Sequence, residues 1–396
     1  MKGFQRLIMG LTVALSLFSG CVEPVEIEIT EETRLLVVDG IITDAPGPYQ
    51  VKLSVSGPLN QNLYIPETGA SLMIEAESGE KTPLNEVMEG VYVTDSSALR
   101  GQTGQNYRLL ITRNNGNVYQ SSWETIRPSP AIDSVYFRIE AQNRGNGLEN
   151  GVQVYVDTHD PTGNSRFYRW TWSETWKYSV PHSTPFEYIG NMSTRYIEEK
   201  RVCFMNDNSR LIRIGTSTGN SSDIIAGERL DFITTETNRL QMRYSMNVSQ
   251  YVLSEQEYLF WKSIQEATEN TGTLFDRQPQ STTGNVKNTN DPNESVLGYF
   301  SASGVSEKRA YFQGSDFQYD ITSDVKFRQE CNADLDTILL GPFADQQVFR
   351  AIDEGGVFFN FYQPFIFVAG FLITSPECSD CTVQGGTTQV PDFWEE

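Results

Sequence analysis

The chain has 396 residues, a length that corresponds to two or three domains. Its 51 aspartates and glutamates exceed its 30 lysines and arginines, giving a net charge of −21 at pH 7. Binding to nucleic-acid phosphates or to anionic lipid headgroups requires a basic surface, which so acidic a chain is not expected to have. The chain has two histidines, His159 and His182, which argues against histidine-based metal sites and catalysis. We therefore expect no nucleic-acid partner, no metal and no cofactor.

Residues 1–20 have the pattern of a secretion signal. Lys2 and Arg6 precede a mostly apolar run over residues 7–18, which is too short to cross a bilayer as a permanent helix. Ser19, Gly20 and then Cys21 follow, an order that resembles a bacterial lipoprotein signal, although Phe18 stands where Leu is usual. We expect Cys21 to become the acylated N-terminus of the mature chain. The alternative is an ordinary secretory peptide followed by a chance cysteine.

The first part of the mature chain is expected to be a tether followed by a small β-domain. Residues 21–34 contain five glutamates and few core residues, as expected of a tether between membrane and folded body. Residues 35–127 contain six or seven short runs of β-forming residues separated by turn residues and no helical pattern. This spacing predicts an immunoglobulin-like β-sandwich.

Residues 128–396 are predicted to form a larger β-rich sandwich domain with one inserted amphipathic helix over 254–270. Ser254 and Glu257 have the spacing of a capping box at the start of this helix. The polar stretch 273–294 is expected to be a long surface loop, and loops of that length are usually functional or disordered. The apolar residues of 357–373 are expected to form a buried strand pair rather than a membrane span, because polar residues interrupt them.

Four cysteines remain after Cys21. They are Cys203, Cys331, Cys378 and Cys381. In an exported chain they predict two disulfides, with three possible connectivities. Cys378 and Cys381 also have the spacing of redox and zinc motifs, but glycine and threonine follow them rather than a helix, and no second pair of ligands has similar spacing. Structural disulfides are therefore favoured over a redox or zinc site.

One predicted strand carries a row of large aromatic side chains at alternate positions. The row comprises Tyr168, Trp170, Trp172, Trp176 and Tyr178. Alternate residues of a strand share one face of the sheet, so the row is either a buried core face or a platform for stacking sugar rings. The polar residues between them make the core interpretation the simpler one.

Residues 215–219 match the nucleophile-elbow pattern of serine hydrolases, with Ser217 at its centre. No apolar helix follows the motif, and both histidines precede the serine, whereas that fold places its histidine after the nucleophile. We interpret the motif as a turn and expect no catalytic residues.

Several segments together resemble a family of Bacteroidetes outer-membrane lipoproteins, named only as domain of unknown function number 4249. The segments are residues 36–40, 253–254, 258–261, 270–276, 283–286, 297–303, 378–381, 385–387 and 391–394. The resemblance implies a two-part β protein on the outer membrane, commonly paired with a TonB-dependent transporter. It implies no activity and no catalytic residues.

These observations favour a lipid-anchored accessory or binding protein of the outer membrane, facing the cell surface, that works with a TonB-dependent transporter in capturing an unknown ligand. A free-standing glycan- or peptide-binding adhesin is the alternative, and a hydrolase ranks third. The residues expected to contact a ligand or partner are Tyr168, Trp170, Trp172, Arg277, Asn285 and Asn288.

Overall fold

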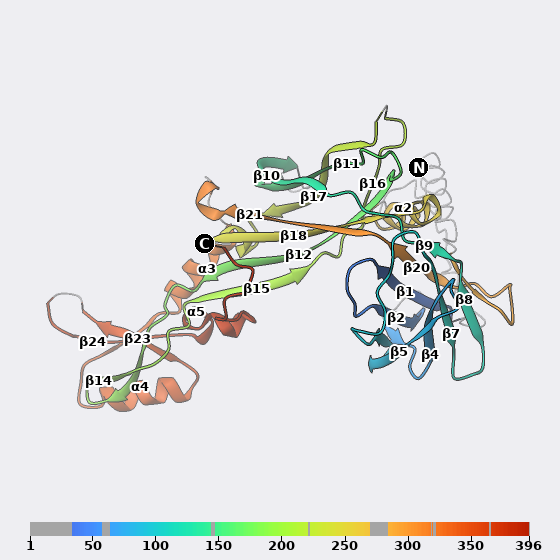
Figure 1. Cartoon of the computed structure of the whole chain (residues 1–396). Coiled ribbons are helices and arrows are strands. Elements are labelled where there is room, and N and C mark those ends of the chain that lie inside the picture. The colour runs from blue at the N-terminus through green and yellow to red at the C-terminus, as the bar shows by residue number, and fades with distance from the viewer. Residues whose placement is uncertain are drawn as a thin grey trace, which may run out of the picture.

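The computed structural model describes residues 34–57, 64–143, 147–220, 222–269, 284–317, 319, 322–363 and 366–395. The protein is mostly β, with 48% of the described residues in strands and 15% in helices. Figure 1 shows the first strands gathered at the right, long strands in the middle and a separate lobe at the lower left. Each of these three regions has its own hydrophobic core.

The N-terminal region is one curled sheet that nearly closes into a barrel. The strands follow the order β19-β8-β7-β4-β5-β6-β2-β1-β20, with β3 on β2 and β9 on β7. Their bounds are Leu36–Thr43 (β1), Gln50–Val55 (β2), Ile65–Pro66 (β3), Ser71–Ala76 (β4), Lys81–Met88 (β5), Val91–Thr94 (β6), Asn106–Thr112 (β7), Val118–Ser121 (β8), Glu124–Thr125 (β9), Val286–Asn288 (β19) and Leu297–Ser303 (β20).

The immunoglobulin-like sandwich predicted for residues 35–127 is wrong, because its strands form a single curved sheet rather than two packed sheets. Two strands from much later in the chain complete this sheet. β20 pairs in parallel with β1, and β19 pairs antiparallel with β8. Short strands separated by turns predict antiparallel pairing between neighbours. They do not show which distant segments of the chain pair with the two edge strands of the sheet. The prediction of a loop over residues 273–294 is also wrong in part, because residues 286–288 form strand β19. Residues 270–283 lie outside the described part of the chain.

The central region is a sandwich of two sheets, as predicted in outline for the larger domain. One sheet has the order β10-β11-β17 and the other β15-β12-β18-β21, with β16 also on β12. The apolar faces of the two sheets form one core between them. Their bounds are Ile132–Asn143 (β10), Leu148–His159 (β11), Phe167–Ser179 (β12), Val202–Asn208 (β15), Arg213–Thr216 (β16), Ile224–Thr234 (β17), Arg243–Val252 (β18) and Val305–Gln313 (β21).

The predicted helix over 254–270 is confirmed as α2 (Glu255–Glu269). The hydroxyl of Ser254 accepts a hydrogen bond from the backbone N–H of Glu257 at 3.1 Å, which caps the first turn. Tyr258 packs against Phe167 of β12, and Phe260 packs against Tyr299 of β20. The helix therefore lies at the junction between the central sandwich and the barrel-like sheet.

The third region is a small lobe, here called the distal unit, made of residues 186–197 and 336–374. Strands β13 (Phe186–Gly190) and β14 (Ser193–Tyr196) form its hairpin, and β22 (Asp336–Leu339), β24 (Gly370–Thr374) and β23 (Val357–Tyr362) form its sheet. The pairing of β23 with β24 confirms the strand pair predicted over 357–373. Helix α4 (Ala344–Asp353) completes the unit through Ala344 and Val348.

The expectation of a single helix is wrong, because α3 (Thr322–Ala333), α4 and α5 (Pro376–Ser379) accompany α2 in the described chain. Three short 3₁₀ helices also form, η1 (Asn238–Leu240), η2 (Gly314–Asp316) and η3 (Cys381–Gln384). Helix α3 buries Cys331 but few large apolar side chains, so its sequence has little helical periodicity. Tertiary contacts and a disulfide fix it instead.

Candidate functional site

A cavity of about 550 Å³ opens at one end of the central sandwich. Strand β12, helix η1, the first turn of α3 and helix η3 surround it. Three aromatic side chains, Trp176, Tyr178 and Phe327, line it together with polar groups. The polar lining residues used below are Glu174, Asp207, Glu236, Asn238, Arg239, Gln241, Ser323, Asp324 and Gln384.

A buried ion pair stands at the wall of this cavity. One Arg239 nitrogen, Nη1, lies 3.0 and 2.8 Å from the two Glu174 carboxylate oxygens and 3.3 Å from Asp231. The hydroxyl of Tyr244 also donates to Glu174 at 2.6 Å. Burial opposes the charge of Arg239, but the neighbouring carboxylates raise its pKa overall, so the guanidinium stays charged. Glu174 lies on the aromatic face of β12, where a carboxylate is tolerated because it is paired.

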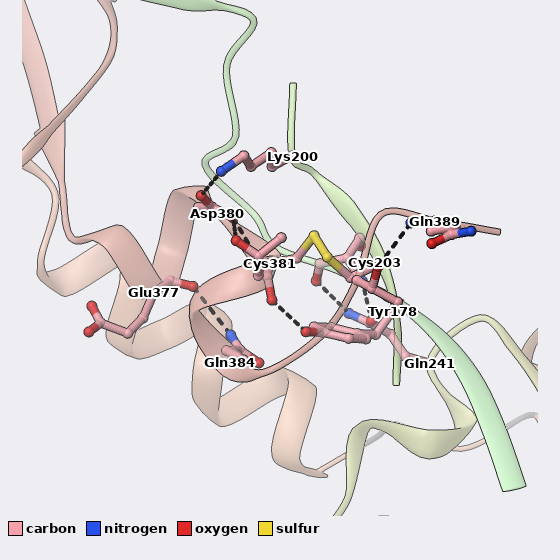
Figure 2. Close-up of a disulfide and its surroundings, with 12 residues drawn as sticks. Tyr178, Lys200, Cys203, Gln241, Glu377, Asp380, Cys381, Gln384 and Gln389 are labelled. Carbon is pink, nitrogen blue, oxygen red and sulfur yellow. Dashed lines mark hydrogen bonds and ion pairs between the residues drawn. A yellow bond between two sulfur atoms is a disulfide. The ribbon is translucent and has the colours of Figure 1, made fainter. Parts of the chain in front are cut away.

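Two disulfides lie beside the cavity, at the base of the distal unit. Cys203 pairs with Cys381, and Cys331 pairs with Cys378. The prediction of two structural disulfides is therefore confirmed, and Cys378 and Cys381 belong to different bonds. Figure 2 shows the first of them, with the hydroxyl of Tyr178 donating to the carbonyl of Cys381 at 2.6 Å.

The connections into and out of the distal unit are tied together at the same place. The backbone N–H of Val180 donates to the carbonyl of Arg201, and that of Cys381 donates to the carbonyl of Lys200. The N–H of His182 donates to the carbonyl of Cys378 at 2.9 Å. These bonds and the two disulfides form a neck that joins the distal unit to the central sandwich.

The distal unit carries many large hydrophobic side chains on its surface. Eleven of them are exposed, namely Phe186, Ile189, Met192, Tyr196, Ile197, Leu339, Leu340, Phe343, Phe349, Ile366 and Phe367. A lone exposed apolar residue is ordinary, whereas large contiguous apolar patches are typical of interaction surfaces. We call this set the apolar tip.

A second polar cluster lies inside the protein, where α2 meets the barrel-like sheet. The Glu257 carboxylate accepts hydrogen bonds from the Trp261 indole N–H at 3.2 Å and from the hydroxyl of Ser301. Glu124 accepts from the hydroxyl of Tyr299 at 3.1 Å. Burial raises the pKa of Glu257 to about 7, although both of its hydrogen bonds favour the charged form.

One comparison with known protein families bears on this arrangement. The model of the family described as "Domain of unknown function (DUF4249)" matches residues 22–309. The chain belongs to the DUF4249 family. The matched range contains the barrel-like sheet and the central sandwich up to β21. Most of the distal unit, helix α3 and the final disulfide cysteines lie beyond it.

No curated protein matches this DUF4249 chain. Among solved structures, one similar chain is described as "Biofilm associated protein - BSP domain". It is 8% identical, with a TM-score of 0.15, and the alignment covers 71% of this chain. The DUF4249 chain spans 59% of that structure's length.

The structure brings several of the segments that carry the family resemblance to one place. Ser254, Trp261, Asn285, Tyr299 and Ser301 all lie at the junction cluster of Glu257 and Glu124. The backbone packs closely there, since a Cβ on Gly284 would lie 1.7 Å from the carbonyl oxygen of Gly298. These segments therefore build the contact between two regions of the fold.

Five of the six residues that were expected to contact a ligand or partner lie in the described part of the chain, and all five make contacts within the fold instead. Tyr168, Trp170 and Trp172 are at most 4% exposed and belong to the central core, so they offer no platform for a ligand. Asn285 donates to Glu124 and to the carbonyl of Phe300, and Asn288 bonds to Glu294 and to two backbone N–H groups.

Both asparagines therefore hold the barrel-like sheet together rather than face a partner. Arg277 lies outside the described residues, as does Cys21. The lining residues Glu174, Asn238 and Gln384 were missed by the sequence reasoning. The one signal for Glu174 is its position on the aromatic face of β12, between Trp172 and Trp176.

Ser217 lies in a turn, as predicted. Its hydroxyl donates to Asp223 at 2.9 Å, and its side chain is buried. His159 bonds to Asp133 instead. No histidine bonds to Ser217 within the described part of the chain, so the turn lacks the base that a serine nucleophile needs.

Two further features are absent from the described residues. They contain no group of three or more histidine, cysteine, aspartate or glutamate residues able to hold a metal ion. None of their helices combines the length and the apolar character needed to span a bilayer.

Proposed function

We propose that this DUF4249 protein is a lipid-anchored accessory protein on the outer face of the outer membrane, which docks on a TonB-dependent transporter and helps to capture its ligand. The observation that carries the proposal is the apolar tip. Eleven exposed hydrophobic side chains on one small unit do not contribute to its folded core. Burial against a bound partner protein explains their presence better. The lipoprotein signal expected over residues 1–20, directly before Cys21, supports the membrane anchor.

The charge of the distal unit favours a protein partner over a lipid surface. Its carboxylates are Glu187, Asp336, Asp345, Asp353 and Glu354, against the two arginines Arg195 and Arg350. An excess of carboxylates on the distal unit is repelled by anionic lipid headgroups. It complements a protein surface that combines apolar and basic side chains.

The neck supports the same role, because a docking surface is more effective when it is held in one orientation. Two disulfides and several backbone hydrogen bonds fix the distal unit at its base. Pre-organisation of this kind lowers the entropic cost of association.

Co-purification from solubilised outer membranes tests the proposal. We expect the tagged wild-type protein to bring down a transporter, identified by mass spectrometry. The double variant Leu339→Ser, Phe343→Ser removes two exposed side chains of the apolar tip and should reduce recovery at least about tenfold, the effect of losing about 1.4 kcal/mol of binding. The matched control is Leu148→Ser, which removes an exposed leucine at one end of β11.

Absence of any transporter in the wild-type sample would reject the accessory role. If the double variant brings down as much transporter as the wild type, the protein docks through another surface. The free-standing adhesin remains a second candidate because the cavity beside the neck has the size of a ligand site. An adhesin would bind a glycan or peptide without co-purifying a transporter.

A further inference from the structure

We infer that the cavity between β12, η1, α3 and η3 binds a neutral carbohydrate. Its volume of about 550 Å³ lies within the usual range of small-molecule sites, which is roughly 300–1,000 Å³. The inference deepens the proposed function, on whose capture role it rests, by naming the class of ligand.

The charges around the cavity argue against an anionic ligand. Four lining carboxylates, those of Glu174, Asp207, Glu236 and Asp324, face one lining cation, Arg239. Arg239 is already held by Glu174 and Asp231. An anion entering the cavity would find no unpaired cation among its described lining residues and would lose its hydration as well.

The same carboxylates argue against a cationic ligand, because each already has a partner. Asp324 accepts from Arg328 at 2.8 Å, Glu236 lies 3.3 Å from Lys326, and Asp207 lies 3.6 Å from Arg210. Glu174 is saturated by Arg239 and Tyr244. The cavity is therefore best matched by a ligand without net charge.

The remaining hydrogen-bonding capacity is neutral and mixed. The Ser323 hydroxyl oxygen is buried and has no partner within the described residues. Asn238 uses its oxygen to accept from the Trp176 indole, which directs its amide nitrogen to other partners. Gln384 uses its nitrogen to donate to the carbonyl of Glu377, which leaves its oxygen as an acceptor (Figure 2). The cavity thus offers a donor, an acceptor and a hydroxyl that can do both.

A polyhydroxylated ring matches this set, because each sugar hydroxyl both donates and accepts. The apolar C–H face of such a ring also requires flat hydrophobic surface. Phe327, which is half-buried, supplies that surface in the cavity wall, whereas Trp176 and Tyr178 also line the cavity but are at most 7% exposed. Trp176 and Tyr178 belong to the same buried core as the rest of the aromatic row.

The test uses the purified full chain in detergent and needs no transporter. Saturation-transfer difference NMR is recorded with glucose, galactose, mannose, N-acetylglucosamine, maltose and cellobiose, and with glucosamine and glucuronate as charged counterparts. We expect saturation transfer to at least one neutral sugar. Gln384→Ala and Ser323→Ala should each weaken its binding roughly 2- to 10-fold, the effect of losing one hydrogen bond.

Gln389→Ala is the matched control, because Gln389 lies five residues further along the same tail, exposed and outside the cavity (Figure 2). Ser323→Ala removes a hydroxyl without a partner and should leave the thermal unfolding temperature unchanged or higher. Transfer to no neutral sugar, transfer only to a charged sugar, or unchanged affinity in both cavity variants would each overturn the inference. None of these outcomes alters co-purification of a transporter, so the two proposals fail separately.

Discussion

The disulfide between Cys331 and Cys378 joins the end of helix α3 to helix α5, and so closes the segment that contains most of the distal unit. The two cysteines are 47 residues apart in the sequence, and the sheet β22-β24-β23 and helix α4 lie between them. The orientation of the apolar tip is thus set by a covalent bond at its base.

Loss of this disulfide is expected to loosen the distal unit and leave the barrel-like sheet intact. In the variant Cys331→Ser, Cys378→Ser, the unfolded state regains the freedom of a long loop, which costs about 2–5 kcal/mol of stability. Hydrogen exchange measured by mass spectrometry should quicken over residues 336–374 and stay unchanged over β1 to β8. Equal protection of the distal unit in the wild type and in the double variant would mean that its small hydrophobic core keeps it folded without the disulfide.

Gly298 is expected to be essential for the pairing of β1 with β20. Its φ is +89°, and a Cβ there would lie 1.9 Å from the carbonyl oxygen of Val38. Gly298→Ala should lower the free energy of unfolding in urea by more than about 3 kcal/mol, because backbone strain and a steric clash add.

Gly79→Ala provides the control for backbone strain alone. Gly79 has the same φ of +89°, but nothing lies within 4 Å of its Cβ position. Its substitution should cost about 1–2 kcal/mol. Equal losses at the two positions would show that the close approach of β1 and β20 contributes nothing.

Glu257 is expected to make stability fall as pH rises from about 4.5 to 7. Burial raises its folded-state pKa from 4.5 to about 7, so over this range the folded state binds a proton that the unfolded state has released. Stability from this group is present at low pH and lost as pH rises through the folded-state pKa. The variant Glu257→Gln cannot titrate and should weaken this dependence.

Urea unfolding at pH 5 and pH 7.5 measures the effect. Relative to wild type, Glu257→Gln should be more stable at pH 7.5 than at pH 5. Glu266→Gln, on an exposed position of the same helix, should show the same difference from wild type at both pH values. An identical pH dependence for wild type and Glu257→Gln would show that the buried carboxylate is charged throughout this range.

Acylation of Cys21 is expected from the signal sequence. Cys21→Ser should move the protein from the membrane fraction to the soluble fraction, because no acyl chains would then hold it to the bilayer. Fractionation followed by immunoblotting checks this. Retention of the variant in the membrane fraction would show that another part of the chain, or its partner, supplies the attachment.

The sequence predicts strands and α2 well where local signals are strong. The alternation from Tyr168 to Tyr178 gives β12, and the spacing of Ser254 and Glu257 gives the start of α2. It does not predict closure of the barrel-like sheet, because the residues that pair with β1 lie about 260 positions away. Nothing local to Leu297 or Val37 specifies that pairing.

The candidate sites were harder to predict for a related reason. The cavity draws its lining from five separated segments, and Asn238, Ser323 and Gln384 are ordinary polar residues in three of them. Their significance depends on which hydrogen bonds remain unmade, which only the three-dimensional arrangement shows. Asn285 and Asn288 were misassigned because polar residues in a polar segment look exposed, whereas here they bond inside a sheet.

The parallel pairing of β1 with β20 also sets the order in which the protein can fold. During synthesis, β1 emerges before the other described strands, whereas its neighbour β20 arrives after most of the central sandwich. Until then β1 presents an open edge of backbone donors and acceptors, which other chains can pair with. Contacts so distant along the chain form slowly. This edge should therefore be the point at which the newly made protein most depends on a chaperone.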